Sequence, residues 1–233
     1  MCMRPTGWKD WLEACRLRAG KGAGTMRKIT SGRKRQKGNA IIEFALVITF
    51  LVMLLMGTFS VGMTLTKSVQ AGVIARDAGA MFMRYVDFTL TGNKDILVRL
   101  ANGMQMTTNG GNGVVIMSQI MMVGTNECSA GGLSTGACPN YNQAVVIKRV
   151  TVGNTALYTT TYGTPAPSLI QTDGTISTTN YLNDSSVRAP NFAAVMTLNG
   201  GEYAYLSEAY FKTPEIDMPG YRDNTYVYQR NIF

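Results

Sequence analysis

The chain has 233 residues, of which 45% are apolar and 15% are charged, and it contains 4 Cys and no His. This length permits one or two domains with a sizeable hydrophobic core. Because His is absent, the chain by itself supplies no Ser-His-Asp triad, no Cys-His pair and no His-bearing metal site. We therefore expect no metal ion and no cofactor.

The net charge of +8 is concentrated at the start of the chain. Residues 1–38 contain 11 Lys and Arg against 2 Asp and Glu, whereas residues 39–233 contain 11 Lys and Arg against 12 Asp and Glu. A nearly neutral body argues against nucleic acid as a partner. We interpret residues 1–38 as a basic leader. Met26 is an alternative translation start, because residues 26–38 carry six Lys or Arg and no acid.

A long apolar segment follows the leader. Phe44 to Thr66 contains 23 residues without a charge or a proline, and a helix of that length extends about 34 Å, enough to cross the roughly 30 Å hydrocarbon core of a bilayer. By the positive-inside rule, the basic residues before it place the N-terminus in the cytoplasm and residues 67–233 outside. These basic residues are Arg33, Lys34, Arg35 and Lys37. We expect residues 39–66 to form the transmembrane half of a helix.

Two other interpretations of the apolar segment are open. A cleavable secretory signal has a shorter apolar run that ends in a small-x-small cleavage site; here the run is longer and follows the carboxylate of Glu43. A buried core helix of a soluble protein rarely stays apolar on every face over such a length. The sequence therefore favours a single membrane span.

The helical pattern continues after the apolar segment, because apolar residues recur there at spacings of three and four. They are Ala71, Ile74, Ala78, Met81, Phe82 and Tyr85. We predict one helix from about 39 to 88 whose second half packs against a sheet through this stripe. Asn93 is expected to cap a short helix at 94–101 that ends at Asn102-Gly103. Together these segments make residues 67–104 an amphipathic continuation of the helix followed by a short helix.

Residues 105–233 show the pattern of a β-rich domain. Val and Ile dominate 114–123 and 143–152, whereas Tyr and Phe mark 202–212 and 224–232; such segments are typical of strands. The stretch 153–189 is rich in Thr, Asn, Gly and Ser and is expected to be a long surface excursion. We predict an α+β fold, in which an antiparallel sheet packs on the long N-terminal helix.

The four cysteines divide between leader and body. Cys2 and Cys15 lie in the leader, and Cys128 and Cys138 lie between two predicted strands. The predicted topology puts the second pair outside the cytoplasm, where thiols oxidise, so we expect a disulfide between Cys128 and Cys138. Metal or redox chemistry is the alternative, but the spacing is not Cys-x-x-Cys.

The junction between leader and apolar segment is the stretch most informative about function. It reads Gly38-Asn39-Ala-Ile-Ile-Glu43-Phe44. Gly38 lets the backbone enter a tight proteolytic site without a side-chain clash, and the basic leader is held at an anionic membrane surface. Cleavage after Gly38 would give Asn39 a new α-ammonium group. Glu43 would then pair with that group in a neighbouring subunit and set the register of packed helices; the alternative is a carboxylate tolerated at the membrane interface.

These residues resemble a known family. Gly38, four further residues, Glu43, Phe44 and a long apolar helix resemble a prepilin of the type IV pilus superfamily, and GNAIIEFALV resembles the TadE-like proteins of the tight-adherence (Tad) pilus system. SVQAGVIARDAGAMFMR and GGEYAYLSEAYFKTP are similar to later segments of that group. Thr49 and Ser60 depart from its pattern, which often has Pro and an acidic residue at these places.

The resemblance implies a role in filament assembly and no catalysis. A prepilin peptidase would cut after Gly38, and the subunit would wait in the inner membrane as a single-pass protein. An assembly platform would then transfer its helix from lipid to other pilin-like subunits, in a pilus that serves adhesion or secretion. Glu43-Phe44 and the large outer domain fit a minor pilin or pseudopilin, since major tight-adherence pilins are short and usually have Glu-Tyr there.

Other functions are open at this point. The chain could be a pseudopilin of a type II secretion or competence machine, or an uncleaved single-pass envelope protein with an outer binding domain. Enzymatic acid–base chemistry would need a pair such as Glu215 with Asp217, which lie between two prolines and are more typical of a solvated turn. The aromatic residues of the last two predicted strands could form an adhesive patch, although core or cross-strand pairing is the more common use of such residues.

Overall fold

The structure is a computed structural model that describes residues 39–213 and 226–233. Several residues singled out in the sequence lie outside these described residues. They are Cys2, Cys15, Met26, Arg33, Lys34, Arg35, Lys37, Gly38, Glu215 and Asp217. The chain separates into two compact units, residues 1–50 and residues 51–233.

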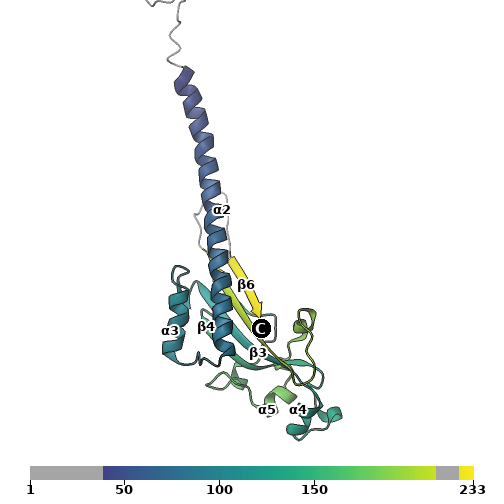
Figure 1. The fold of residues 1–233 in the computed structure, drawn as a ribbon. Helices are drawn as coiled ribbons and strands as arrows, with labels where there is room; N and C mark the ends of the chain where they lie inside the picture. The colour runs from purple at the N-terminus through teal and green to yellow at the C-terminus, as the bar shows by residue number, and fades with distance from the viewer. Residues whose placement is uncertain (1–38, 214–225) are drawn as a thin grey trace, which may run out of the picture. The chain divides into compact units, whose positions relative to one another are not determined.

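The described elements alternate between helical segments and strands (Figure 1). The helices are α2 (Asn39–Met83), α3 (Thr91–Leu100), α4 (Thr125–Ala130) and α5 (Thr178–Asn183). Short 3-10 turns are η1 (Thr135–Ala137), η2 (Pro167–Leu169), η3 (Ser185–Val187) and η4 (Pro190–Ala194). The strands are β1 (Met106–Thr107), β2 (Gly110–Gly111), β3 (Gly113–Met122), β4 (Ala144–Gly153), β5 (Tyr203–Lys212) and β6 (Tyr226–Ile232).

The helix α2 is 45 residues long and ends earlier than the predicted residue 88. Tyr85 adopts a left-handed backbone conformation, with φ of 62°. The N–H of Val86 donates to the carbonyl of Met81, and the N–H of Tyr85 donates to that of Phe82. These two bonds form a Schellman motif, which closes the helix at Met83 and places Tyr85 outside the packed stripe.

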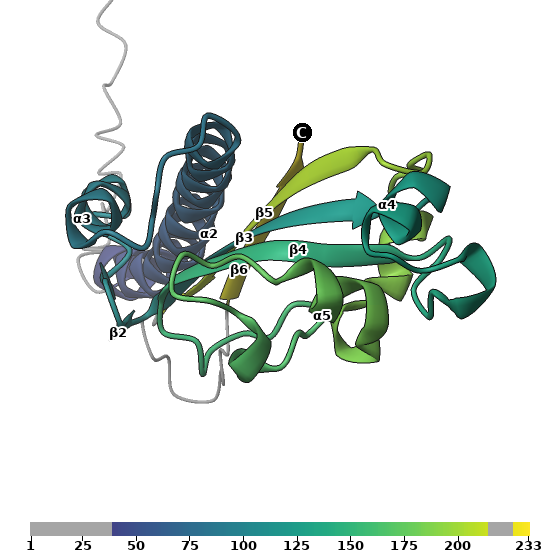
Figure 2. The same ribbon diagram turned by 90° about the horizontal axis from the view of Figure 1, so that it is seen from below.

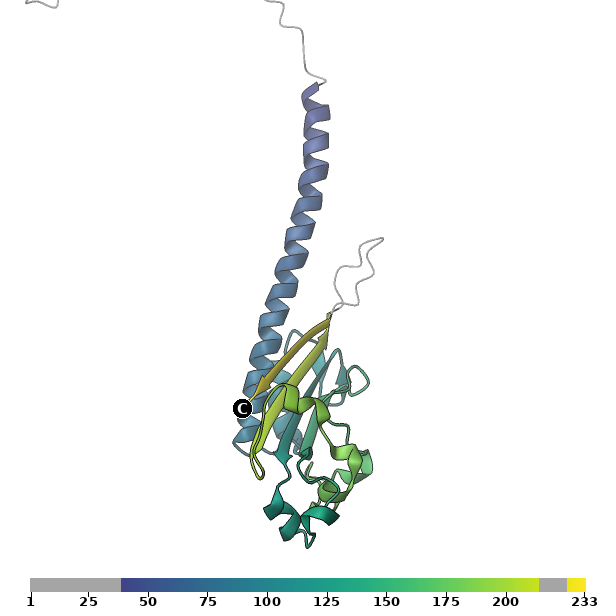
Figure 3. The ribbon, with the colours of Figure 1, turned by 90° about the vertical axis from the view of Figure 1, so that its right-hand side faces the viewer.

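Four long strands form one antiparallel sheet in the order β4-β3-β5-β6. Each begins and ends within two residues of the predicted bounds. β3 lies in the centre and pairs with both β4 and β5, and its pairing with β4 shifts between Gln119 and Ile120. Figure 3 shows β5 and β6 lying side by side. The predicted α+β arrangement of a long helix on an antiparallel sheet is confirmed.

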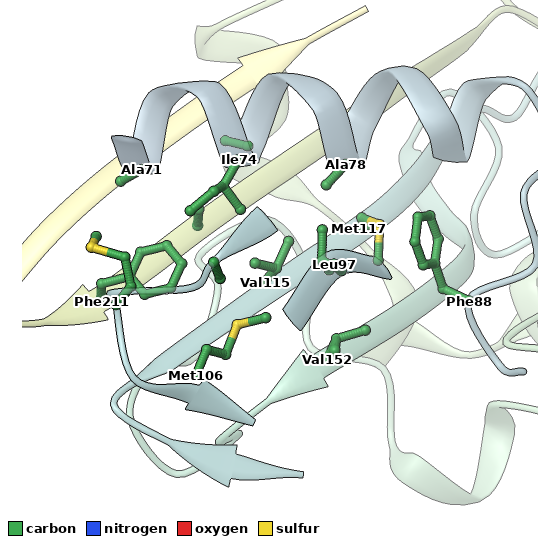
Figure 4. Close-up of a cluster of buried hydrophobic side chains, with 14 of the residues drawn as sticks. Ala71, Ile74, Ala78, Phe88, Leu97, Met106, Val115, Met117, Val152 and Phe211 are labelled. Carbon is green, nitrogen blue, oxygen red and sulfur yellow. The ribbon is translucent and has the colours of Figure 1, made fainter. Parts of the chain in front are cut away.

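One face of the sheet is covered by the second half of α2 (Figure 2). The predicted stripe is buried at Ala71, Ile74, Ala78 and Phe82 and half-buried at Met81, whereas Tyr85 is 80% exposed. Alternate residues of the strands meet it, as Figure 4 shows for Val115, Met117, Val152 and Phe211. The small side chains on α2 allow the helix to lie close to the strands.

Gly79 marks the closest approach between helix and sheet. A Cβ at this position would contact the ring of Phe233 and would lie 3.0 Å from the Cβ of Ser207. Farther along α2, the side-chain amide of Gln229 donates to the hydroxyl of Ser68 at 3.2 Å. These contacts fix β6 beside the helix, because any larger side chain at Gly79 would push the two elements apart.

The short helix α3 differs from its prediction at the N-terminal end. It begins at Thr91, and its N-cap position is Leu90, which makes no side-chain capping bond. Asn93 is therefore inside the helix, and the prediction that it is the cap is wrong. Its amide instead donates to the carbonyl of Asp87 at 2.7 Å, so the side chain ties α3 to the loop that follows α2.

The stretch 153–189 is only partly the surface excursion that its composition predicts. Tyr162, Ile176, Leu182 and Val187 are buried and form a second core with strand residues such as Ile120. Figure 2 shows α2 and this stretch on opposite sides of the sheet. The buried amide of Asn140 holds the stretch in place by donating to the carbonyls of Tyr181 and Asp184. Polar composition concealed these contacts, because a few apolar anchors suffice to fold such a segment onto a sheet.

Candidate functional site: the assembly helix and the polar face of the sheet

The first described turns of α2 carry the predicted registry residues. Asn39 is its first described residue, and the side chains of Glu43 and Phe44 are exposed. Both lie on a helix that is exposed on all sides through residue 50. The bond between Gly38 and Asn39 is outside the described residues, so its cleavage stays a prediction.

The apolar part of α2 that belongs to the second unit, residues 51–66, is also largely exposed. Its large side chains are uncovered, among them Leu51 (58%), Met53 (69%) and Leu65 (62%). Among the described residues, one helix, Ala40–Met83, is long and apolar enough to cross a membrane. A soluble monomer rarely exposes an apolar surface of this extent, so the segment requires lipid or other protein as its surroundings.

The polar groups of this segment are satisfied within the helix itself. The hydroxyls of Thr49, Thr58 and Thr66 donate to backbone carbonyls three or four residues earlier, at 2.8, 3.0 and 2.9 Å. In a hydrocarbon environment an unsatisfied hydroxyl is costly, and such bonds remove that cost. The departure at Thr49 therefore leaves the helix compatible with a membrane.

Cys128 and Cys138 form a disulfide with an S–S distance of 2.11 Å, as predicted. Both residues are buried, and Cys128 lies in α4. The bond closes a loop between β3 and β4, next to the second core. This end of β3 is about 30 Å from Gly113 at the other end, since a strand rises about 3.3 Å per residue.

A buried carboxylate on the sheet face opposite α2 was not found from the sequence. Glu208 on β5 is 1% exposed. Its Oε1 accepts hydrogen bonds from the hydroxyls of Tyr228 at 2.7 Å and Tyr158 at 3.0 Å. Its Oε2 is buried and has no hydrogen-bond partner among the described residues. Two tyrosines thus hold one oxygen of this carboxylate in an otherwise closed environment.

A buried arginine accompanies this carboxylate. The guanidinium of Arg149 on β4 donates to the hydroxyl of Ser118 and to the carbonyls of Gly163 and Tyr162, at 3.0, 2.6 and 2.9 Å. Burial lowers the pKa of Arg149 to about 10, and the charge of Glu208 opposes that change. The arginine fastens the stretch 153–189 to the sheet, because two of its three acceptors belong to that stretch.

Burial also changes the ionisation of the two tyrosines. It raises the pKa of Tyr158 to about 12, and it raises the pKa of Tyr228 further, with their mutual hydrogen bond and Glu208 adding to the effect on Tyr228. Both phenols therefore remain neutral donors at any physiological pH. The group is a neutral-phenol clamp around an anion, an arrangement that stabilises the fold and contains no obvious reactive nucleophile.

The late aromatic residues mostly pair with one another, as expected for strands. Tyr210 stacks on Tyr226 across β5 and β6 with ring centroids 5.1 Å apart, and Tyr158 stacks on Tyr210 at 5.2 Å. Phe211 is fully buried, and Tyr205 meets Phe82 edge to face at 6.0 Å. The contacts favour cross-strand and core packing over a single adhesive patch.

A small open pocket lies where α2 leaves its apolar segment. It has a volume of about 50 Å³ and is lined by Lys67, Gly103, Met104, Gln105, Lys212 and Thr213. The described residues contain no group of three or more His, Cys, Asp or Glu side chains placed to hold a metal ion.

Comparison with known proteins identifies the helical part of the chain. Residues 38–79 match the model of a family described as TadE-like protein. The resemblance predicted from GNAIIEFALV is confirmed over this range, which includes Gly38, Asn39, Glu43 and Phe44. No curated protein and no solved structure matches the chain significantly. The match ends before the sheet begins, so it describes the helix and leaves the outer domain without a named relative.

Proposed function

Residues 38–79 are a TadE-like domain, and from this premise we propose that the chain is a minor pilin or pseudopilin of a tight-adherence pilus. A prepilin peptidase cuts it after Gly38, and the mature subunit waits in the inner membrane with its sheet domain outside. The pilus assembly platform then moves α2 from lipid into a bundle with other pilin-like subunits. The chain serves structure, priming or adhesion and carries no catalytic role.

The exposed apolar surface of α2 is the observation that supports this proposal best. Residues 51–66 are uncovered on all sides, whereas the residues after Lys67 bury one stripe against the sheet. One helix thus joins a segment that needs an apolar environment to a segment that anchors a folded domain. A subunit that exchanges lipid for protein contacts requires this division, because its apolar half must have no permanent partner within the chain.

Glu43 supplies the register in this proposal. Its carboxylate lies at the edge of the apolar segment, where a charge is costly unless it is paired. Cleavage after Gly38 creates an ammonium group on Asn39, and the carboxylate of a neighbouring subunit pairs with it. Such pairs specify which axial positions of packed helices are allowed, even when they add little net stability.

The outer domain fits an oxidising compartment. The disulfide between Cys128 and Cys138 belongs to the sheet domain, on the side of the span opposite to the basic leader. Disulfides persist outside the cytoplasm and are rare within it. This agrees with the orientation that the positive-inside rule gives for the same chain.

The proposal is tested by the N-terminal sequence and mass of the protein taken from host membranes and from sheared filaments. The expected N-terminus is Asn39 in both fractions. A Gly38→Leu variant is expected to stay uncut, because a bulky side chain blocks the peptidase site, and Gly32→Leu in the same leader is the matched control that is cut normally. A mature protein that retains the leader would leave an uncleaved single-pass envelope protein as the explanation.

A second comparison separates the machines that this subunit could serve. If deletion of the tight-adherence assembly platform leaves the processed chain out of sheared filaments, the subunit belongs to that pilus. If only deletion of a type II secretion or competence platform has this effect, the chain is a pseudopilin of that machine. In both cases cleavage after Gly38 is expected to be unchanged.

A further inference from the structure

The pocket at the end of the apolar segment lies at a defined height on α2. Lys67 is the first charged residue after the 23 apolar residues from Phe44 to Thr66, and it lines the pocket together with Lys212 at the end of β5. If α2 spans the bilayer as proposed above, both lysines lie at the level of the lipid headgroups on the outer surface.

The pocket is built from three parts of the chain that are tied together. The turn at Gly103–Gln105 forms one wall, and Gln105 has a left-handed backbone with φ of 53°. The side-chain amide of Asn112 donates to the side chain of Gln105 at 2.7 Å, and the N–H of Lys212 donates to the carbonyl of Asn112 at 2.7 Å. One residue thus connects the turn to the strand that carries Lys212, so the pocket wall is braced before any ligand arrives.

The charges at the pocket favour an anion. Two ammonium groups from different elements line it, and no carboxylate among the described residues does. A lysine ammonium offers three donors and suits phosphate as a compact positive charge. Lys67 and Thr213 also make other interactions, so the case rests on Lys212, whose side chain is exposed.

We propose that this pocket binds the phosphate group of a membrane phospholipid on the outer side of the span. The shared chemistry is that of any phosphate, but its position beside the last apolar turn of α2 assigns it to a lipid headgroup. Bound lipid would fix the sheet domain to the membrane surface until the subunit is extracted. The inference rests on the proposed membrane insertion and is independent of cleavage after Gly38.

The test uses the full chain purified in detergent and titrated with phosphatidylglycerol, with bound lipid counted by native mass spectrometry. Lys212→Gln is expected to weaken lipid binding about fivefold, the effect of one lysine near an anionic surface. Lys94→Gln on α3 removes the same charge away from the pocket and is expected to bind as the unchanged protein does. Lys212→Arg keeps the charge and is expected to retain most of the binding.

Two further ligands identify the chemistry. A diacylglycerol glucoside with the same acyl chains lacks the phosphate and is expected to bind weakly and equally to all variants. Inorganic phosphate is expected to compete poorly, because it lacks the acyl chains that hold a headgroup at this height.

The proposal is overturned if Lys212→Gln and Lys94→Gln bind phosphatidylglycerol equally, or if the glucoside binds as tightly as the phospholipid. Displacement of the lipid by an equal concentration of inorganic phosphate would overturn the assignment to lipid. Failure of the proposed function shows elsewhere, as recovery of the chain from the soluble fraction or as an uncut leader, so the two failures are distinguishable.

Discussion

Tyr228 on β6 donates a 2.7 Å hydrogen bond to the carboxylate of Glu208 on β5, and this pair lies on the sheet face opposite the long helix. Tyr158, from the stretch between β4 and β5, donates to the same oxygen. One buried anion therefore gathers a neighbouring strand and a distant loop into a single polar cluster, which a chain with a small apolar core uses to fix an otherwise polar segment.

Tyr228→Phe is expected to lower the free energy of unfolding by about 2 kcal/mol. It removes a hydrogen bond to a buried charged group and leaves that group with one donor on Oε1. The measurement is thermal or urea unfolding of the full chain in detergent, followed by circular dichroism of the sheet. Tyr226→Phe is the matched control, since that side chain is 60% exposed, and its effect is expected to stay within about 0.5 kcal/mol. Equal effects of both variants would show that the clamp contributes nothing.

The buried tyrosines are expected to make the fold sensitive to alkali. The pKa of Tyr158 and that of Tyr205 are raised from 10.0 to about 12, chiefly by burial. The folded state thus keeps protons that the unfolded chain releases, so stability present below pH 10 is lost as the pH rises to about 12. Arg149 acts in the opposite direction, because burial lowers its pKa from 12.5 to about 10, but more tyrosines than arginines contribute.

Tyrosinate absorbance during a pH titration measures this effect directly. The folded chain is expected to titrate in two stages, with a late group that becomes early when urea is added. Tyr158→Phe is expected to shrink the late group. A single stage near pH 10 in the folded protein would contradict the burial of these phenols.

Gly79→Ala is expected to destabilise the protein by about 1–3 kcal/mol, because the added Cβ meets Phe233 and Ser207. Gly62→Ala is the matched control in the same helix, where a Cβ would meet nothing within 4 Å. That change is expected to be neutral or slightly stabilising, since alanine is the better helix former. Unfolding temperatures of the two variants side by side test the seam; a Gly79→Ala variant as stable as Gly62→Ala would show that helix and sheet pack differently.

Glu43→Gln is expected to leave processing after Gly38 intact and to reduce filament incorporation severely. The substitution keeps the size of the side chain and removes the charge that pairs with the new N-terminus. The measurement compares the processed chain in membranes with that in sheared filaments. Asp95→Asn on α3 removes an exposed carboxylate elsewhere and is expected to assemble normally. Normal piliation with Glu43→Gln would exclude the registry role.

The strands and the helix stripe were predictable because their signals are local. Val114 to Val123 alternates on a sheet buried on both faces, and Ala71, Ile74 and Ala78 recur at the helical period, so composition and spacing alone place them. The end of α2 was not predictable in this way. Tyr85 takes the left-handed position that glycine or asparagine usually signals, and nothing in the residue type marks it.

The polar cluster was missed for a different reason. Glu208, Arg149 and Tyr158 are separated by dozens of residues, and each alone resembles a solvated side chain. Only the pairing order of the strands brings them together. Glu208 lies between Leu206 and Tyr210 on one face of β5, and a charge at an inward position of an aromatic strand is the signal that points to it.

The central strand belongs to both cores, with Met117 in the one under α2 and Ile120 in the other, beyond the shift in pairing. Tension applied along α2 would therefore enter the sheet through Val115 and Met117 and bypass the lobe closed by the disulfide. That lobe bears no mechanical load, so its outward residues are free to diversify while the shaft keeps its grip.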